Sequence, residues 1–141
     1  MNMGLVYAEI ELVNPGDILL HKRGFIKETE IRREKVKCLV DSGVYMMCIN
    51  ESIKNQLGLE HVRYETAQLA DGTLKKIEVV GPLTVNFINR GTNCNAMVLP
   101  GNTEVLLGAI PMEDLDVIID PRNQTLALPP DRPYMAQKSL K

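Results

Sequence analysis

The chain has 141 residues, of which 45% are hydrophobic and 24% charged, as expected for one globular domain that buries its own core. Sixteen basic and eighteen acidic side chains leave a formal net charge of -2, so no broad positive field favours nucleic acid or anionic lipid. No stretch approaches the roughly 20 apolar residues of a membrane-spanning helix. The composition therefore predicts no nucleic-acid partner and no membrane partner.

The three cysteines and two histidines do not form a metal-binding pattern. Cys38, Cys48 and Cys94 lie far from any Cys-x-x-Cys spacing, so we expect no metal site. Buried thiols act as small apolar residues, and we expect all three in the core or in strands. An odd number of cysteines without a secretory signal favours a reducing compartment, and we expect a cytoplasmic location.

The first forty residues alternate between strand and turn signals. Apolar side chains at every second position of residues 6–13 predict a strand with one face on a core. Residues 14–17 have turn chemistry, residues 18–20 are expected to resume as a strand, and Gly24 indicates a hairpin tip. Residues 36–40 form a more buried predicted strand.

One helix is expected in the next part of the chain, after a short apolar strand at residues 46–49. The side chain of Asn50 can accept a hydrogen bond from an exposed amide at a helix start. Ile53 and Leu57 share one helical face, and Gly58 lies where a C-cap residue takes the left-handed conformation.

The remainder of the sequence reads as short strands separated by turns. Asp71-Gly72 is a hairpin signal between predicted strands at residues 62–69 and 73–80. A single helical turn is expected across residues 111–115. The other predicted strands are residues 83–87, 94–99, 105–107, 117–119 and 125–128.

Many short strands with one or two short helices predict an all-β fold of the small closed or sandwiched kind. We expect one domain per chain over residues 1–128. A polar, Pro-containing C-terminal tail would follow over residues 129–141.

The segment most informative about chemistry is Asp41-Ser42-Gly43, at the end of the apolar strand 36–40. As a bare triplet it is an ordinary turn sequence, because Asp and Ser cap local amides and Gly relaxes the backbone. Its position changes the interpretation, since a buried strand delivers an acidic group to a place where ionisation is costly unless the group is used. Asp41 is therefore the candidate catalytic residue.

The arrangement resembles the retroviral-type (retropepsin-like) family of aspartic proteases. In that family an apolar strand ends in Asp-Thr-Gly or Asp-Ser-Gly, matched here by Asp41, Ser42 and Gly43. Two apolar residues and a glycine later precede a short helix, matched by Leu106-Leu107-Gly108. The match runs from residue 6 to residue 128, and it is similar to small microbial members of the group.

The resemblance implies a closed acid-protease barrel and an aspartic endopeptidase without a cofactor. The chemistry needs two aspartates that share a water, and the sequence offers one triplet in a chain too short for two lobes. A homodimer is therefore implied, with Asp41 catalytic in each copy. Ser42 would hydrogen-bond across the twofold axis, and Gly43 would allow the tight turn.

The family also closes a hairpin flap over an extended peptide. The candidate flap consists of Leu69, Ala70, Asp71, Gly72 and Thr73. Main-chain hydrogen bonds from such a hairpin would hold a peptide or protein substrate and exclude water from it. Without the other motifs, an ordinary exposed hairpin would explain the same residues equally well.

One departure affects the expected cleft, which Val44, Tyr45, Leu107 and Gly108 would line. The family usually has alanine and then a small polar or acidic residue after the triplet, whereas this chain has Val44 and Tyr45. A bulkier Val44 would narrow the cleft. The alternatives to a protease are a catalytically inactive peptide-binding module and a dimerisation module on the same fold.

Overall fold

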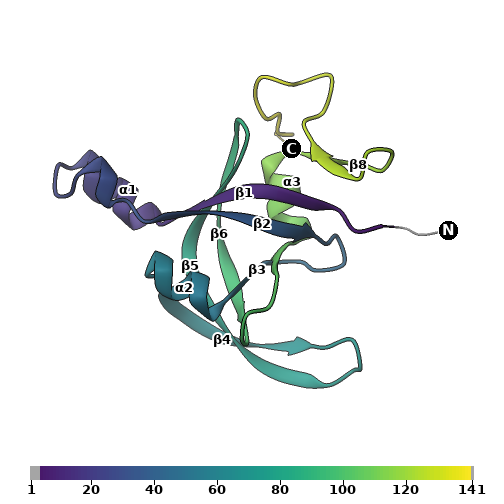
Figure 1. The fold of residues 1–141 in the computed structure, drawn as a ribbon, viewed down its shortest axis with the longest axis horizontal. Helices are drawn as coiled ribbons and strands as arrows, with labels where there is room; N and C mark the ends of the chain where they lie inside the picture. Colours follow the sequence, from purple (N-terminus) through teal and green to yellow (C-terminus); the bar gives the residue numbers. More distant parts are fainter. Residues whose placement is uncertain (1–3, 141) are drawn as a thin grey trace.

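The structure is a computed structural model that describes residues 4–140, and most of its elements are strands (Figure 1). The strands are β1 (Tyr7–Val13), β2 (Arg33–Val40), β3 (Met47–Asn50), β4 (Glu60–Gln68), β5 (Leu74–Phe87), β6 (Arg90–Leu99), β7 (Val105–Leu107), β8 (Ile118–Asp120) and β9 (Thr125–Ala127). The helices are α1 (Pro15–Lys22), α2 (Glu51–Leu57) and α3 (Ala109–Leu115), with a 3-10 turn η1 at Glu28–Glu30.

Six strands close into a barrel. The main sheet has the order β1-β2-β7-β3-β6-β5-β4, and β1 also pairs with β5, so that Leu12 lies opposite Val85. Strand β4 stays outside the ring and pairs with β5 as a long hairpin. The predicted all-β barrel is confirmed, although the described residues contain three short α-helices where one or two were expected.

The alternation of side chains predicts the inner face of the barrel correctly. Ala8, Ile10 and Leu12 of β1 are buried, and they join the inward side chains of the other strands in one core. Leu57 of α2 and Leu115 of α3 are fully buried and close the core from the two helices. Both helices thus gain their stability from packing rather than from length.

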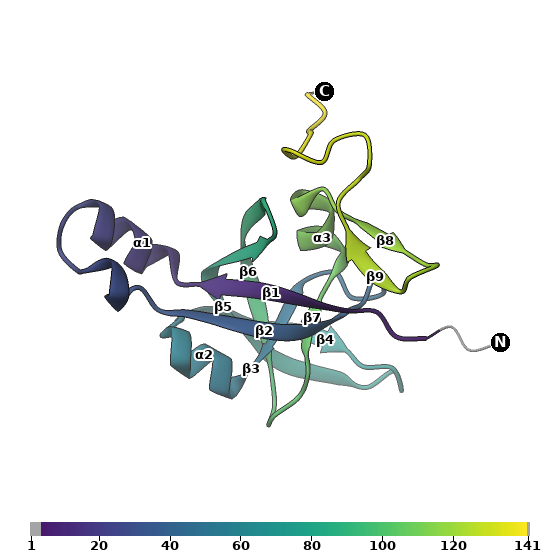
Figure 2. The same ribbon diagram turned by 45° about the horizontal axis from the view of Figure 1, so that its top comes forward.

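The prediction of a turn, a strand and a hairpin tip for residues 14–24 is wrong, because these residues contain helix α1. Asn14 is the N-cap, with its side-chain oxygen accepting from the Asp17 amide at 3.1 Å, and Pro15 opens the helix. Proline is well tolerated at a first helical position, since the N–H it lacks has no helical partner there. Figures 1 and 2 show α1 standing clear of the barrel.

Smaller differences concern element boundaries. Strand β5 runs unbroken through Gly81 and Pro82, where two separate strands were predicted, with an irregularity in its pairing to β6. Helix α3 begins at Ala109, with one residue between it and the end of β7, and two residues before the predicted helical turn. The β8–β9 pair forms a separate two-stranded sheet (Figure 2).

Candidate active site

Asp41 follows directly after β2 and continues that strand's pairing with β7. Val40 and Leu107 are partners in this parallel ladder, and the Asp41 amide donates to the Leu107 carbonyl at 3.0 Å. The ladder fixes the backbone at Asp41, while the side chain remains half-buried at the barrel end. The structure therefore places this carboxyl group at the end of β2, a strand whose last three residues are buried or half-buried.

The turn after β2 holds the Asp41 carboxylate from its own backbone. The Gly43 amide donates to Oδ1 of Asp41 at 3.0 Å, and the Val44 amide donates to the Asp41 carbonyl at 3.2 Å. Ser42 and Gly43 are both exposed. The turn therefore orients one carboxylate oxygen and presents a hydroxyl to solvent beside it.

The chain from Asp41 to Met46 crosses the end of β7, because β7 lies between β2 and β3 in the sheet. At this crossing Gly108 is pressed against backbone: an added Cβ would lie 2.2 Å from the Met46 carbonyl oxygen and 2.6 Å from that of Val44. Only glycine permits this approach. The Leu-Leu-Gly motif thus has a direct physical role in supporting the Asp41 turn.

Helix α3 braces the far side of the same turn with its first two amides. Ala109 donates to the Val44 carbonyl at 2.7 Å, and Ile110 donates to the Tyr45 carbonyl at 2.9 Å. The backbone of Val44 and Tyr45 is therefore fixed although their side chains differ in exposure. Val44 is half-buried, whereas Tyr45 is 77% exposed.

Apolar side chains flank Asp41 on the outer face of the sheet. Leu39 lies two residues before Asp41 and so shares its side of the strand, and Leu106 is the register partner of Leu39. Both leucines are half-buried. Neither leucine was among the site residues predicted from the sequence, although the period of two along a strand, counted back from Asp41, indicates Leu39.

Cys48 lies close to this group because it is the register partner of Leu106 on β3. Burial raises the pKa of the Cys48 thiol to about 11, and the charge of the Asp41 carboxylate adds to the effect. The thiol is therefore protonated at neutral pH and is no nucleophile there.

The β4–β5 hairpin has the predicted turn at its tip. The Leu69 amide donates to the Thr73 carbonyl at 2.8 Å, the Gly72 amide donates to the Leu69 carbonyl at 2.9 Å, and Gly72 has a φ of 86°. Hydrogen bonds from Thr73 lower the pKa of Asp71, the third residue of the tip. Ala70 lies in the turn between the two strands. In both views the hairpin lies on the same side of the barrel as the β2–β3 connection (Figures 1 and 2).

Residues 4–140 lack the side-chain clusters of a metal site and the helices of a membrane span. They contain no group of three or more His, Cys, Asp or Glu side chains placed to hold a metal ion. Within the same residues, no helix has both the length and the apolar character needed to cross a membrane.

Comparison with known proteins relates this architecture to solved structures. No protein-family profile matches the chain, and no curated protein matches its sequence. The retroviral protease-like domain of Ddi1 from Leishmania major has a similar structure, with a TM-score of 0.55, 16% identity, and 90% of each chain covered. A retropepsin-like aspartic protease from Rickettsia conorii aligns with a TM-score of 0.45 and 17% identity, over 85% of this chain and 90% of that one. The likeness to the Ddi1 domain over 90% of each chain shows that this chain has a retroviral protease-like (retropepsin-like) fold.

Proposed function

We propose that this protein is an aspartic endopeptidase that acts as a homodimer, with one Asp41 from each copy. The observation that carries the proposal is the Asp41 turn, in which a half-buried carboxylate is held by the Gly43 amide at the end of a barrel strand. The fold supports it, because the solved relative described above at a TM-score of 0.55 is a retroviral protease-like domain. One triplet per chain makes the site incomplete without a second copy.

The mechanism follows from pairing the two carboxylates across a twofold axis. Two carboxyl groups about 3 Å apart cannot both ionise, so the pair shares one proton and titrates as a unit, as is general for aspartic proteases. The ionised Asp41 takes a proton from the water that attacks the scissile carbonyl. The protonated Asp41 of the partner subunit donates to the carbonyl oxygen and stabilises the developing negative charge.

The substrate in this proposal is an extended peptide or protein segment with apolar side chains next to the scissile bond. Leu39 and Leu106 supply an apolar surface beside Asp41. The β4–β5 hairpin would add main-chain hydrogen bonds to the bound peptide. Ser42, exposed beside the carboxylate, would hydrogen-bond across the axis and hold the two aspartates in register. A cytoplasmic setting is part of the proposal, supported by three cysteines that are free thiols in the structure.

The decisive experiment replaces Asp41 by Asn and measures cleavage of a peptide library from acidic to neutral pH. Asp41→Asn should abolish cleavage, because Asn can neither take nor give the proton, while light scattering still reports a dimer of folded chains. Asp131→Asn is the matched control, since Asp131 is exposed and, among residues 4–140, forms its ion pair with Arg132. Cleavage by the Asp41→Asn dimer would refute the proposal. Absence of turnover by a dimeric wild-type protein that still binds peptide would favour the inactive peptide-binding module.

A further inference from the structure

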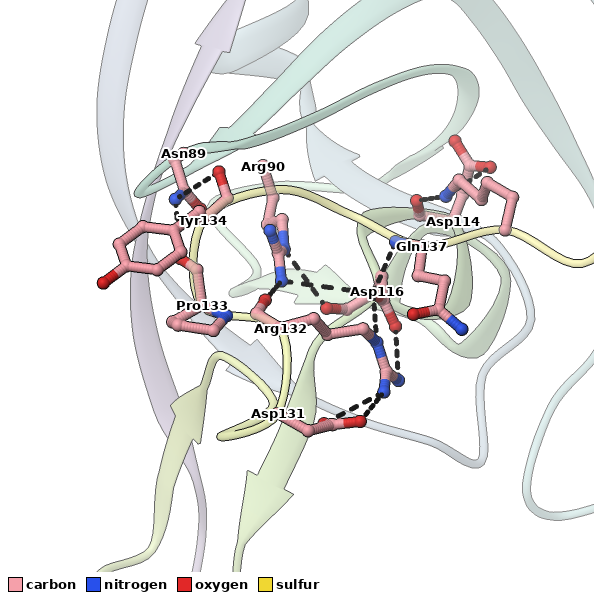
Figure 3. A network of polar contacts seen from close by, with 10 residues as sticks. Asn89, Arg90, Asp114, Asp116, Asp131, Arg132, Pro133, Tyr134 and Gln137 are labelled. Atoms are coloured by element: carbon pink, nitrogen blue, oxygen red, sulfur yellow. Dashed lines mark hydrogen bonds and ion pairs between the residues drawn. The ribbon is translucent and has the colours of Figure 1, made fainter.

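The tail that follows β9 is attached to the C-terminal end of α3 (Figure 3). Asp116 is the C-cap residue of α3, with a φ of 55°. Its carboxylate accepts from Nε of Arg132 at 2.7 Å and from Nη2 at 2.9 Å, and the Gln137 amide donates to it at 2.9 Å. A bidentate ion pair of this kind fixes the relative orientation of the two side chains as well as the distance between them.

A buried arginine joins this attachment to the barrel. Nη2 of Arg90, at the start of β6, donates to the Arg132 carbonyl at 2.6 Å, and Nε donates to the Asp116 carbonyl at 3.3 Å. The Arg90 side chain has no exposed surface, and its Nη1 has no hydrogen-bond partner in the described residues. The charge of Arg90 therefore depends on acceptors that α3 and the tail provide together.

The other end of α3 supports the Asp41 turn through Ala109 and Ile110, as described above. The helix has seven residues and is thus about 10 Å long. Its middle is packed by Pro111 and Met112, both buried. One short, well-packed helix therefore contacts the catalytic turn with its first amides and the tail with its C-cap.

We propose that Arg132 is a positioning residue for the Asp41 turn, acting through Asp116 and α3. Pairing with Arg132 holds the end of α3 in place, and α3 holds the carbonyls of Val44 and Tyr45 at its other end. The catalytic part of this inference rests on the proposed function. The mechanical part does not, and the two are tested separately.

The mechanical part is tested by amide hydrogen exchange on the full chain, with Arg132→Ala as the variant. The amides of Ala109 and Ile110 should exchange about tenfold faster, because their local opening no longer has to break the Arg132 pair. The amides of the β5–β6 ladder should exchange at the wild-type rate. Asp131→Ala is the matched control, since it removes the exposed partner of the same guanidinium and should leave both groups of amides unchanged.

Two outcomes would overturn the inference. In the first, Arg132→Ala leaves the exchange of Ala109 and Ile110 unchanged, while the Gln137 amide, which donates to Asp116, loses its protection. The tail would then be released without any effect on the turn. The other is an equal increase across the β5–β6 ladder, which would show only a loss of global stability. Arg132→Lys keeps the charge but loses the fork, and it should give an intermediate exchange rate.

The catalytic part is tested on the same variants by peptide hydrolysis. Arg132→Ala should lower kcat about tenfold with KM nearly unchanged, because the turn and not the peptide-binding surface is affected. Faster exchange with unchanged kcat would confine Arg132 to a structural role and refute this part. Faster exchange in a protein whose wild type hydrolyses no peptide would refute the proposed function and leave the tail attachment standing.

Discussion

Gly108→Ala should damage the Asp41 turn more than any ordinary glycine substitution would. The added methyl would lie 2.2 Å from the Met46 carbonyl oxygen, about 1.2 Å inside the 3.4 Å at which ordinary contact begins. The Val44 carbonyl oxygen at 2.6 Å and the Tyr45 carbonyl carbon at 2.8 Å block the other directions. All three obstacles are backbone atoms, so no side-chain rotation relieves the contact.

The free energy of unfolding should fall by about 3 to 5 kcal/mol. Overpacking of this kind costs about 1 to 3 kcal/mol, and the displaced turn also loses the hydrogen bonds from Ala109 and Ile110, each worth about 1 kcal/mol. For a chain of this length the melting temperature should drop by about 10 °C or more. Urea unfolding monitored by circular dichroism, together with a thermal melt, measures both quantities.

Gly24→Ala is the matched control for this substitution. Gly24 has a φ of 79° and open space around the position of an added Cβ, so the same chemical change costs only about 1 to 2 kcal/mol of backbone strain there. A Gly108→Ala protein no less stable than Gly24→Ala would refute the reasoning, because the crossing of the turn over β7 would then have room for a side chain.

Two further predictions concern the supports of α1 and α2. Asp17→Asn should lower the free energy of unfolding by about 2 kcal/mol at pH 7, since buried Asp17 accepts three hydrogen bonds from Arg32. These bonds lower the pKa of Asp17. The difference in unfolding free energy between wild type and Asp17→Asn should therefore be at its full value above about pH 4 and shrink as the pH falls below it. Urea titrations that show the same difference at about pH 2.5 would contradict this. Asn50→Ala should cost about 1 to 2 kcal/mol in the same assay, because Asn50 caps α2 by accepting from the Ile53 amide and also donates to the Thr103 carbonyl; an unchanged midpoint would contradict it.

The parts of the fold that the sequence predicts are those with strong local signals. The alternation in β1 identifies its buried face, Asn50 and Gly58 mark the ends of α2, and Asp71-Gly72 marks the tip of the β4–β5 hairpin. Each of these features depends on residues within a few positions of one another. The chemistry of neighbouring side chains therefore decides the local structure before tertiary contacts do.

Helix α1 was missed because two readings of the same residues compete. Pro15 and Gly16 are turn formers, yet proline also opens helices, and an Asn immediately before it is a good N-cap. What decides between the readings lies far along the chain. Asn14 donates to the Leu57 carbonyl at 2.8 Å, and Asp17 pairs with Arg32, so the start of the helix is fixed by tertiary contacts.

The candidate site shows the same division between local and distant signals. The Asp41-Ser42-Gly43 triplet is visible in the sequence, but the turn it forms is braced by groups about 65 residues away. Leu107 extends the ladder to Asp41, Gly108 leaves room for the crossing, and α3 holds the carbonyls beyond it. Parallel pairing of β2 with β7 brings the two motifs together, and no local pattern predicts such a pairing. In the proposed dimer each Asp41 carboxylate must meet that of the second copy, which requires a fixed backbone, and residues 107–110 hold the backbone of this turn in place.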